Sequence, residues 1–282
     1  MATFATSDQL LVIIDPVARQ TDGESVRIAK DVLSAGAAAK VCLPEDPEEF
    51  ARALGRRGSR RPVVIGDDRA LVRAVTLLHR RRELAGCALS VVPVGDSALA
   101  ESLGVPGGTV AAARAVLEGA ERRLDLLVDD SDGVVLGALG IPPAPVRAAG
   151  GSEPVPAVSG GPWYRSLVRT LATRPARPTR LSAVPAPGTR LRVEVDGRTV
   201  VDLDQPVEAV SVAPGPGGVA SVEVRPLSVG AEATPLLASG RTVTVIGEAF
   251  RYRADAAVSG PVRRRTWRVA EGAWRLTLPA VH

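Results

Sequence analysis

Aromatic side chains are scarce in this sequence: Phe, Trp and Tyr make up 3% of its 282 residues. The hydrophobic core must therefore consist mainly of Val, Leu, Ile and Ala. The net charge is +4 and the pI about 9.6. Acidic residues are nevertheless interspersed among the basic ones, and the sequence lacks an aromatic and basic platform on which bases could stack. We therefore expect no nucleic-acid partner.

Histidine and cysteine are equally rare. Neither His79 nor His282 has a carboxylate or a cysteine beside it in the pattern of a zinc site or a catalytic triad. Cys42 and Cys87 are far apart in the sequence and have apolar neighbours, which predicts buried, reduced thiols. A serine-hydrolase elbow is also lacking. The sequence therefore predicts no metal site, and no catalytic residue can be named from it.

Long hydrophobic runs are absent too. The first apolar run ends at Asp15, too early for a signal peptide, and no stretch approaches the roughly 20 apolar residues that span a bilayer. We therefore expect a cytoplasmic protein with at most peripheral membrane contact. Arginine clusters at 56–61, 79–82 and 263–265 fit either a lipid or anionic membrane surface or an ordinary solvated surface. The candidate partners are a lipid surface and a second copy of the chain, with which it would form a homodimer.

The first part of the chain alternates between strand and helix patterns. Near-continuous apolar strands separated by helices are typical of a mainly parallel, doubly wound α/β sheet covered on both faces. The predicted domain comprises residues 1–141. Its predicted strands are 9–15, 38–44, 61–67, 88–95, 123–130 and 133–140, and its predicted helices are 24–35, 47–58, 69–84, 97–103 and 109–120.

The remainder of the chain has a different composition. Residues 142–188 are rich in Pro, Gly, Ala and Ser, which indicates a linker, with a short helix at 163–172. Residues 189–282 are predicted to form an antiparallel β domain whose last strand returns to the first domain. Asp196-Gly197 marks a hairpin. The predicted strands are 191–195, 199–203, 207–213, 220–227, 241–247, 249–256, 263–270 and 273–279.

Three turns follow strands of the predicted parallel sheet: Asp15-Pro16, Gly66–Arg69 and Gly95–Ser97. Ligands of such sheets bind at the carboxyl ends of the strands, so we expect these turns to lie along one rim. Asp68 has two interpretations that the sequence leaves open. It is either a functional carboxylate or the N-cap of the helix at 69–84.

This order of elements resembles the diacylglycerol kinase catalytic family of lipid kinases, which shares its fold with NAD kinases. Asp15-Pro16 stands where the family has Asn-Pro, and Gly66-Asp67-Asp68-Arg69-Ala70 where it has Gly-Gly-Asp-Gly-Thr. The segment from Pro93 to Glu101 stands where the family has Pro-x-Gly-Thr-Gly-Asn-Asp-Phe-Ala-Arg. Leu103-Gly104-Val105-Pro106 matches its Leu-Gly-Ile-Pro. The resemblance covers most of the chain.

The resemblance implies binding of ATP and magnesium. The residues that it places around the cofactor are Asp15, Pro16, Gly66, Asp67, Asp68, Arg69, Gly95, Asp96 and Ser97.

The sequence departs from the family at the catalytic motifs. Asp67 and Arg69 replace glycines, and their side chains fill space that the phosphates would need. Residues 216–220 replace the family's Asp-Gly-x-Leu-Asp and lack both acids, and Asp255-Ala256-Ala257 replaces its Val-Asp-Gly-Glu turn. Without these acids, a phosphoryl transfer has no evident general base.

Three functions stay open at this stage. The first is an ATP-dependent lipid kinase that uses Asp68 and a rearranged acid site. The second is a non-catalytic lipid-binding or partner-binding module, and the third is an NAD kinase-like activity. The sequence favours a diacylglycerol kinase-like protein with reduced or lost activity.

Overall fold

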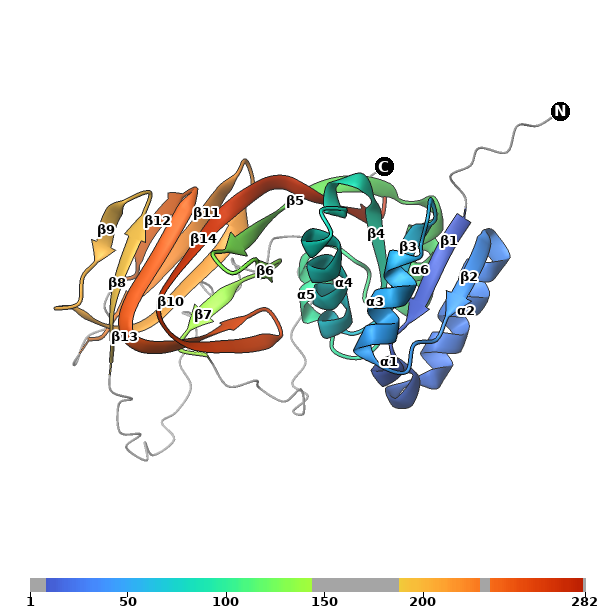
Figure 1. The fold of residues 1–282 in the computed structure, drawn as a ribbon, viewed down its shortest axis with the longest axis horizontal. Coiled ribbons are helices and arrows are strands. Elements are labelled where there is room, and N and C mark those ends of the chain that lie inside the picture. Colours follow the sequence, from blue (N-terminus) through green and yellow to red (C-terminus); the bar gives the residue numbers. More distant parts are fainter. Residues whose placement is uncertain (1–8, 144–187, 229–233, 281–282) are drawn as a thin grey trace, which may run out of the picture.

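Strands alternate with helices in the first half of the chain (Figure 1). A computed structural model describes residues 9–143, 188–228 and 234–280. The strands of the first half are β1 (Gln9–Ile14), β2 (Ala38–Cys42), β3 (Arg61–Gly66), β4 (Ala88–Pro93), β5 (Ala120–Asp129), β6 (Val134–Val135) and β7 (Leu139–Ile141). The helices are α1 (Pro16–Thr21), α2 (Gly23–Gly36), α3 (Pro47–Gly55), α4 (Asp68–Arg80), the 3-10 turn η1 (Leu84–Gly86), α5 (Ala98–Ser102) and α6 (Thr109–Glu118).

Aspartate begins each of the first four helices. Asp15, Asp22, Asp46 and Asp67 each accept a hydrogen bond from a backbone N–H in the first turn of the following helix. This is the preferred way of satisfying the free amides at a helix N-terminus. Helix α1 was not predicted, because its Asp-Pro start was interpreted as a turn. Among the described residues, none of the helices has both the length and the apolar character that crossing a bilayer requires.

Four strands of the first half pair in parallel, in the order β2-β1-β3-β4. β1 and β3 are almost entirely buried, as their continuous apolar sequences predict. β2 lies at the edge of the sheet. The parallel arrangement brings the carboxyl ends of β1, β3 and β4 together at one rim.

The second half of the described chain is built from antiparallel strands. They are β8 (Thr189–Val195), β9 (Arg198–Val201), β10 (Pro206–Gly215), β11 (Val219–Pro226), β12 (Leu236–Gly240), β13 (Thr242–Ala254) and β14 (Ala257–Leu278). Asp196 and Gly197 both have positive φ and connect β8 to β9, as the hairpin prediction requires. The predicted helix at 163–172 lies outside the described residues.

Three predictions of the strand boundaries were wrong. The predicted strand 133–140 is two short strands, β6 and β7. The pairs 241–247 with 249–256, and 263–270 with 273–279, are single strands, β13 and β14. The predicted breaks coincide with shifts of the pairing register, between Ile246 and Phe250 and between Ala270 and Trp274. A bulge interrupts the alternation of side chains without ending the strand. Strand β12 was not predicted.

β14 joins the two halves of the molecule (Figure 1). Its first part pairs with β13, and its last part pairs in parallel with β4, with Arg275 beside Ala88. β5 runs antiparallel along it from Ala120 to Asp129. The fully buried Trp274 belongs to the core of the first half and the fully buried Trp267 to the core of the second. One strand therefore contributes to both hydrophobic cores.

The two cysteines differ from the prediction. Cys42 and Cys87 are free thiols, but both are half-buried rather than buried. Cys42 lies at the end of the edge strand β2, which has no outer neighbour among the strands of the described residues. Burial raises the pKa of the Cys87 thiol above its ordinary value.

Candidate functional site

The structure brings the three predicted turns together at the carboxyl ends of β1, β3 and β4. The N–H of Asp15 donates to the carbonyl of Ile65 at 2.9 Å, and the N–H of Asp68 donates to the carbonyl of Asp96 at 2.9 Å. The end of β3 and the turn that follows it therefore contact both neighbouring turns. This rim is the candidate site, and the role of each of its residues follows from its contacts.

Asp15 is buried, with 1% of its surface exposed. One carboxylate oxygen, Oδ1, accepts a hydrogen bond from the N–H of Val17 at 2.9 Å, so that Asp15 caps α1, with Pro16 as its first residue. The other oxygen, Oδ2, accepts from Nη1 of Arg73 at 2.6 Å. Both oxygens of Asp15 are therefore engaged in holding α1 and α4 against the sheet.

Glycine is required at two positions of the rim for different reasons. A Cβ atom on Gly66 would lie 2.8 Å from Cβ of Ala70 and 3.0 Å from Cβ of Asp15, closer than packed side chains allow. Gly95 has a φ of 97°, a conformation that other residues rarely adopt. Gly66 therefore permits close packing of β3, α1 and α4, and Gly95 permits the turn after β4.

Asp67 is the N-cap of α4, and Arg69 is exposed on the first turn of that helix. The Asp67 side chain accepts a hydrogen bond from the N–H of Ala70 at 2.9 Å. The sequence interpretation that assigned this capping role to Asp68 was therefore wrong by one residue.

Asp68 instead caps a different helix. Its Oδ2 accepts from the N–H of Leu99 at 2.7 Å and its Oδ1 from the N–H of Ala100 at 3.0 Å, at the start of α5. Asp68 is 7% exposed, and burial raises the pKa of its carboxyl group, while the two N–H donors oppose that rise. The nearby Asp96 and Asp67 raise the pKa further. Asp68 therefore fixes the position of α5 against α4.

Asp96 and Ser97 directly precede α5, but Asp68 caps that helix. Ser97 stands at the N-cap position, but its side chain makes no capping hydrogen bond. Its Oγ donates to Oε1 of Glu101 at 2.7 Å. Asp96 contributes its backbone carbonyl to Asp68 and is exposed.

Asp255 is the residue of this region whose importance the sequence did not reveal. It was interpreted as a turn residue, and it does lie in the turn between β13 and β14, with a φ of 48°. Its carboxylate also accepts three hydrogen bonds of 2.8 to 3.1 Å from the N–H groups of Leu136, Gly137 and Ala138. Only its alignment with the family's turn could have indicated a role.

The Asp255 carboxyl group has an altered pKa. This pKa is raised to about 6, mainly by burial and to a lesser extent by the neighbouring Asp68, against the lowering effect of the three N–H donors. Asp255 lies near the rim, because a Cβ atom on Gly137 would lie 3.2 Å from its Oδ1. Gly137 also approaches the rim, since a Cβ atom on it would lie 2.6 Å from Cδ1 of Leu99. The loop between β6 and β7 therefore packs on the start of α5.

Asp125 has a similar structural role further along the boundary. It was not proposed as a catalyst from the sequence, and its oxygens accept hydrogen bonds from the N–H of Gly218 at 2.9 Å and of Gly272 at 2.6 Å. Gly218 lies in the 216–220 segment that replaces an acidic family motif. Asp125 thus ties that turn to β5 and β14.

The residues of the rim do not fit magnesium ATP. Phosphates bind to free backbone N–H groups at helix N-termini and in loops. Here carboxylates of the chain itself, from Asp67, Asp68 and Asp255, already accept hydrogen bonds from such groups in α4, α5 and the β6–β7 loop. Within the described ranges, no group of three or more acidic, histidine or cysteine side chains has the arrangement of a metal site.

Comparison with known proteins gives structural neighbours only. No protein-family model and no curated protein matches the chain. Two solved structures, each described as a "putative diacylglycerol kinase" from Bacillus anthracis str. Sterne, superpose with TM-scores of 0.69 and 0.70 at 14% identity. Each superposition covers 98% of this chain, and it covers 98% of the first structure's chain and 97% of the second's.

A third structure, described as a diacylglycerol kinase of the same organism, superposes with a TM-score of 0.62 at 11% identity, and each chain covers 98% of the other. The likeness therefore extends over the whole length of these proteins. It confirms the fold that the order of elements predicted: the chain has the diacylglycerol kinase-like fold.

Proposed function

We propose that this protein is a diacylglycerol kinase-like protein in which ATP-dependent phosphoryl transfer is lost or strongly reduced, and that it acts as a binding module. The observation that carries the proposal is the pair of hydrogen bonds from Leu99 and Ala100 to Asp68. These bonds engage both oxygens of Asp68, the residue that aligns with the aspartate of the family's glycine-rich motif.

Electrostatics support the same conclusion. Asp67 and Asp68 lie in the turn after β3 and Asp96 in the turn after β4, and Arg69 is the only cation of the sequence Gly66–Arg69. Two like charges about 4 Å apart repel by about 4 kcal/mol at an effective dielectric constant of 20. A triphosphate placed at this turn would meet that repulsion from more than one carboxylate. Arg69 offsets part of it.

A lipid kinase is the second candidate, favoured by the superposition over 98% of the chain on proteins described as diacylglycerol kinases. For this candidate, magnesium ATP is the cofactor and a lipid hydroxyl the acceptor. Asp68 would have to exchange its two N–H donors for another partner, which leaves buried amides of α5 unsatisfied at a cost of about 1–3 kcal/mol.

Calorimetric titration of the full-length protein with magnesium ATP separates the two candidates, together with an assay of phosphate transfer from ATP to diacylglycerol in mixed micelles. We expect neither saturable binding at millimolar ATP nor transfer above background. Saturable binding with turnover that Asp68→Ala abolishes, and that a surface control such as Arg114→Gln retains, would establish the kinase instead. Circular dichroism of each variant verifies folding.

The proposed partner of the binding module is an anionic lipid surface, which the arginine clusters at 56–61, 79–82 and 263–265 would contact. Several members of the arginine clusters are engaged internally: Arg57 pairs with Glu83, Arg81 donates to the carbonyl of Ala51, and Arg265 pairs with Asp130. The clusters are therefore less available to a lipid surface than the sequence suggests. Sedimentation with vesicles of neutral and of anionic lipid tests peripheral membrane contact, which requires binding to the anionic vesicles only.

A further inference from the structure

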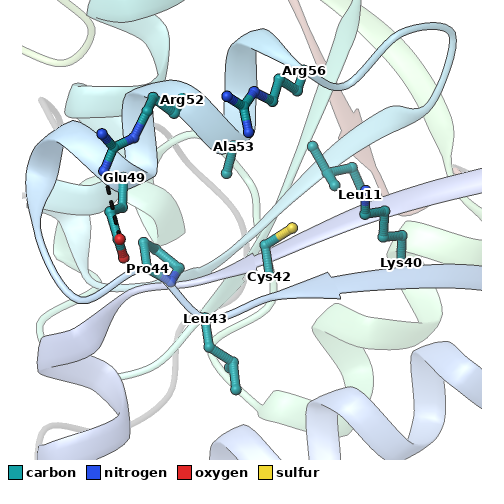
Figure 2. A pocket seen from close by; sticks show the side chains of 9 residues that line it. All are labelled: Leu11, Lys40, Cys42, Leu43, Pro44, Glu49, Arg52, Ala53 and Arg56. Atoms are coloured by element: carbon teal, nitrogen blue, oxygen red, sulfur yellow. Dashed lines mark hydrogen bonds and ion pairs between the residues drawn. The ribbon is translucent and has the colours of Figure 1, made fainter.

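We propose that a pocket between β2 and α3 binds a small amphiphilic anion, with a phosphate or carboxylate head on a short apolar body. The pocket has a volume of about 310 Å³, within the range of small-molecule sites. Figure 2 shows the side chains from α3 and from the edge strand β2 that line it. Lys40, Arg52 and Arg56 provide its positive charge, and Leu11, Cys42 and Ala53 are among its apolar lining.

The pocket is a consequence of helical and strand spacing. The pocket residues Arg52 and Ala53 of α3, and Arg56 at its C-cap, follow Glu49 by three, four and seven residues, so that all four lie on one side of the helix. That face looks onto β2, from which Lys40 and Cys42 project to the same side of the sheet, being two residues apart. Because β2 is the edge strand of the sheet, no further strand from residues 9–143, 188–228 or 234–280 closes the pocket.

The cations of the pocket are available to a ligand. Lys40 and Arg56 are exposed, and no described residue pairs with their side chains. Arg52 has a single weak contact, 3.5 Å from Oε1 of Glu49. Oε2 of Glu49 accepts from the N–H of Glu45 at 2.9 Å, so the one carboxylate of the pocket is already partly satisfied. Three cations against one engaged acid select an anion.

The apolar lining distinguishes an amphiphile from a bare ion. Leu11 is 2% exposed and belongs to the main core, and Cys42 and Ala53 pack against that core. An inorganic anion has no apolar surface to bury against this lining. An alkyl or aryl body does, and it gains about 25 cal/mol for each Å² of apolar surface removed from water.

Lys40 also argues against addition of a strand to the edge of the sheet. It occupies the middle of β2, where charge, and lysine above all, is a common device that prevents edge pairing. In an antiparallel pair of two copies centred on the middle of β2, each Lys40 would face the other, and like charges opposite each other are destabilising. The occupant we infer is therefore a small molecule.

The pocket shares no residue with the rim at Asp67 and Asp68. Ligand binding in the pocket is therefore independent of the proposed function, and an experiment can contradict one proposal without contradicting the other.

Calorimetric titrations of the full-length protein with octyl phosphate, octanoate, inorganic phosphate and 1-octanol test the proposal, with each amphiphile below its micellar concentration. We expect octyl phosphate or octanoate to bind saturably, and the tighter of the two identifies the head group. Inorganic phosphate and octanol should each bind at least about tenfold more weakly, since each offers half of the interaction. Equal binding of inorganic phosphate, or no saturable binding of either amphiphile, would overturn the proposal.

Variants locate the bound ligand. Arg52→Gln combined with Arg56→Gln should weaken binding by about tenfold or more. Arg114→Gln removes a charge from an exposed arginine of α6 and should leave affinity unchanged.

The two cysteines provide a second readout. Alkylation of Cys42 by iodoacetamide should slow when the amphiphile is bound, while alkylation of Cys87, outside the pocket, should not. Unchanged affinity in the double arginine variant, or no protection of Cys42, would contradict the assignment.

Discussion

Asp68 at the start of α4 accepts a 2.7 Å hydrogen bond from the backbone N–H of Leu99 at the start of α5, 31 residues away in the sequence. A second bond, from Ala100, completes the cap. The acid that aligns with the phosphate-binding motif of the lipid kinases thus serves the chain's own backbone. Asp67 and Asp255 do the same for the N–H groups of α4 and of the β6–β7 loop. These three acids therefore stabilise the positions of α4, α5 and the β6–β7 loop.

Asp68→Ala should lower the free energy of unfolding by about 2 kcal/mol, because it leaves two N–H groups at the start of α5 without an acceptor. Urea unfolding monitored by circular dichroism measures the change. Asp96→Ala, at an exposed neighbouring acid, is the matched control and should stay within about 0.5 kcal/mol of the wild type. Equal effects of the two substitutions would refute the capping role.

Gly66→Ala should destabilise the fold by about 1–3 kcal/mol, since the new Cβ atom would collide with Ala70 and Asp15. Gly23→Ala is the control, because no atom lies within 4 Å of a Cβ at that position. It should be neutral or stabilising by about 0.5 kcal/mol through the unfolded state. Thermal unfolding of both variants provides the comparison, and a harmless Gly66→Ala would contradict the close packing of β3, α1 and α4.

Arg73→Met should cost about 3 kcal/mol, because it leaves the buried carboxylate of Asp15 without its charged partner. Combining it with Asp15→Asn should recover part of that loss, since the unpaired charge is then removed. A double-mutant cycle of chemical denaturation gives the interaction energy. Strict additivity of the two substitutions would show that the pair does not interact.

Asp255 should make stability depend on pH. Its pKa is raised from 3.8 to about 6 in the folded protein, so the folded state holds the proton more tightly than the unfolded state does. As pH rises from 3.8 to about 6, the unfolded state ionises first, and the contribution of Asp255 to stability falls. The separation of the two pKa values limits this fall to about 3 kcal/mol.

Asp255→Asn removes this titration. Between pH 3.8 and about 6, the free energy of unfolding of the wild type should fall relative to that of the variant. Above pH 6 the difference between the two proteins should stay constant. Urea unfolding of both proteins at several pH values measures the difference. A constant difference across the window would show that burial does not raise the pKa of Asp255.

The sequence predicted the parallel strands well, because β1 and β3 are continuous apolar runs bounded by turn residues. It failed at β13 and β14, where a bulge interrupts the alternation of side chains and suggests an end. Helix α1 was missed because an Asp-Pro start is common to turns and helices. Local patterns were therefore reliable where burial is uniform and misleading where the pairing register shifts.

The sequence by itself determined which acids stand at the rim, that the flanking strands are buried and that the glycines of the family motif are replaced. Only the tertiary structure decided what those acids do. Asp68 meets Leu99, and Asp255 meets Leu136, Gly137 and Ala138, across 31 and more than 100 residues of chain. Hydrogen bonds between such distant groups depend on how strands and helices pack, and no local pattern of residues encodes them.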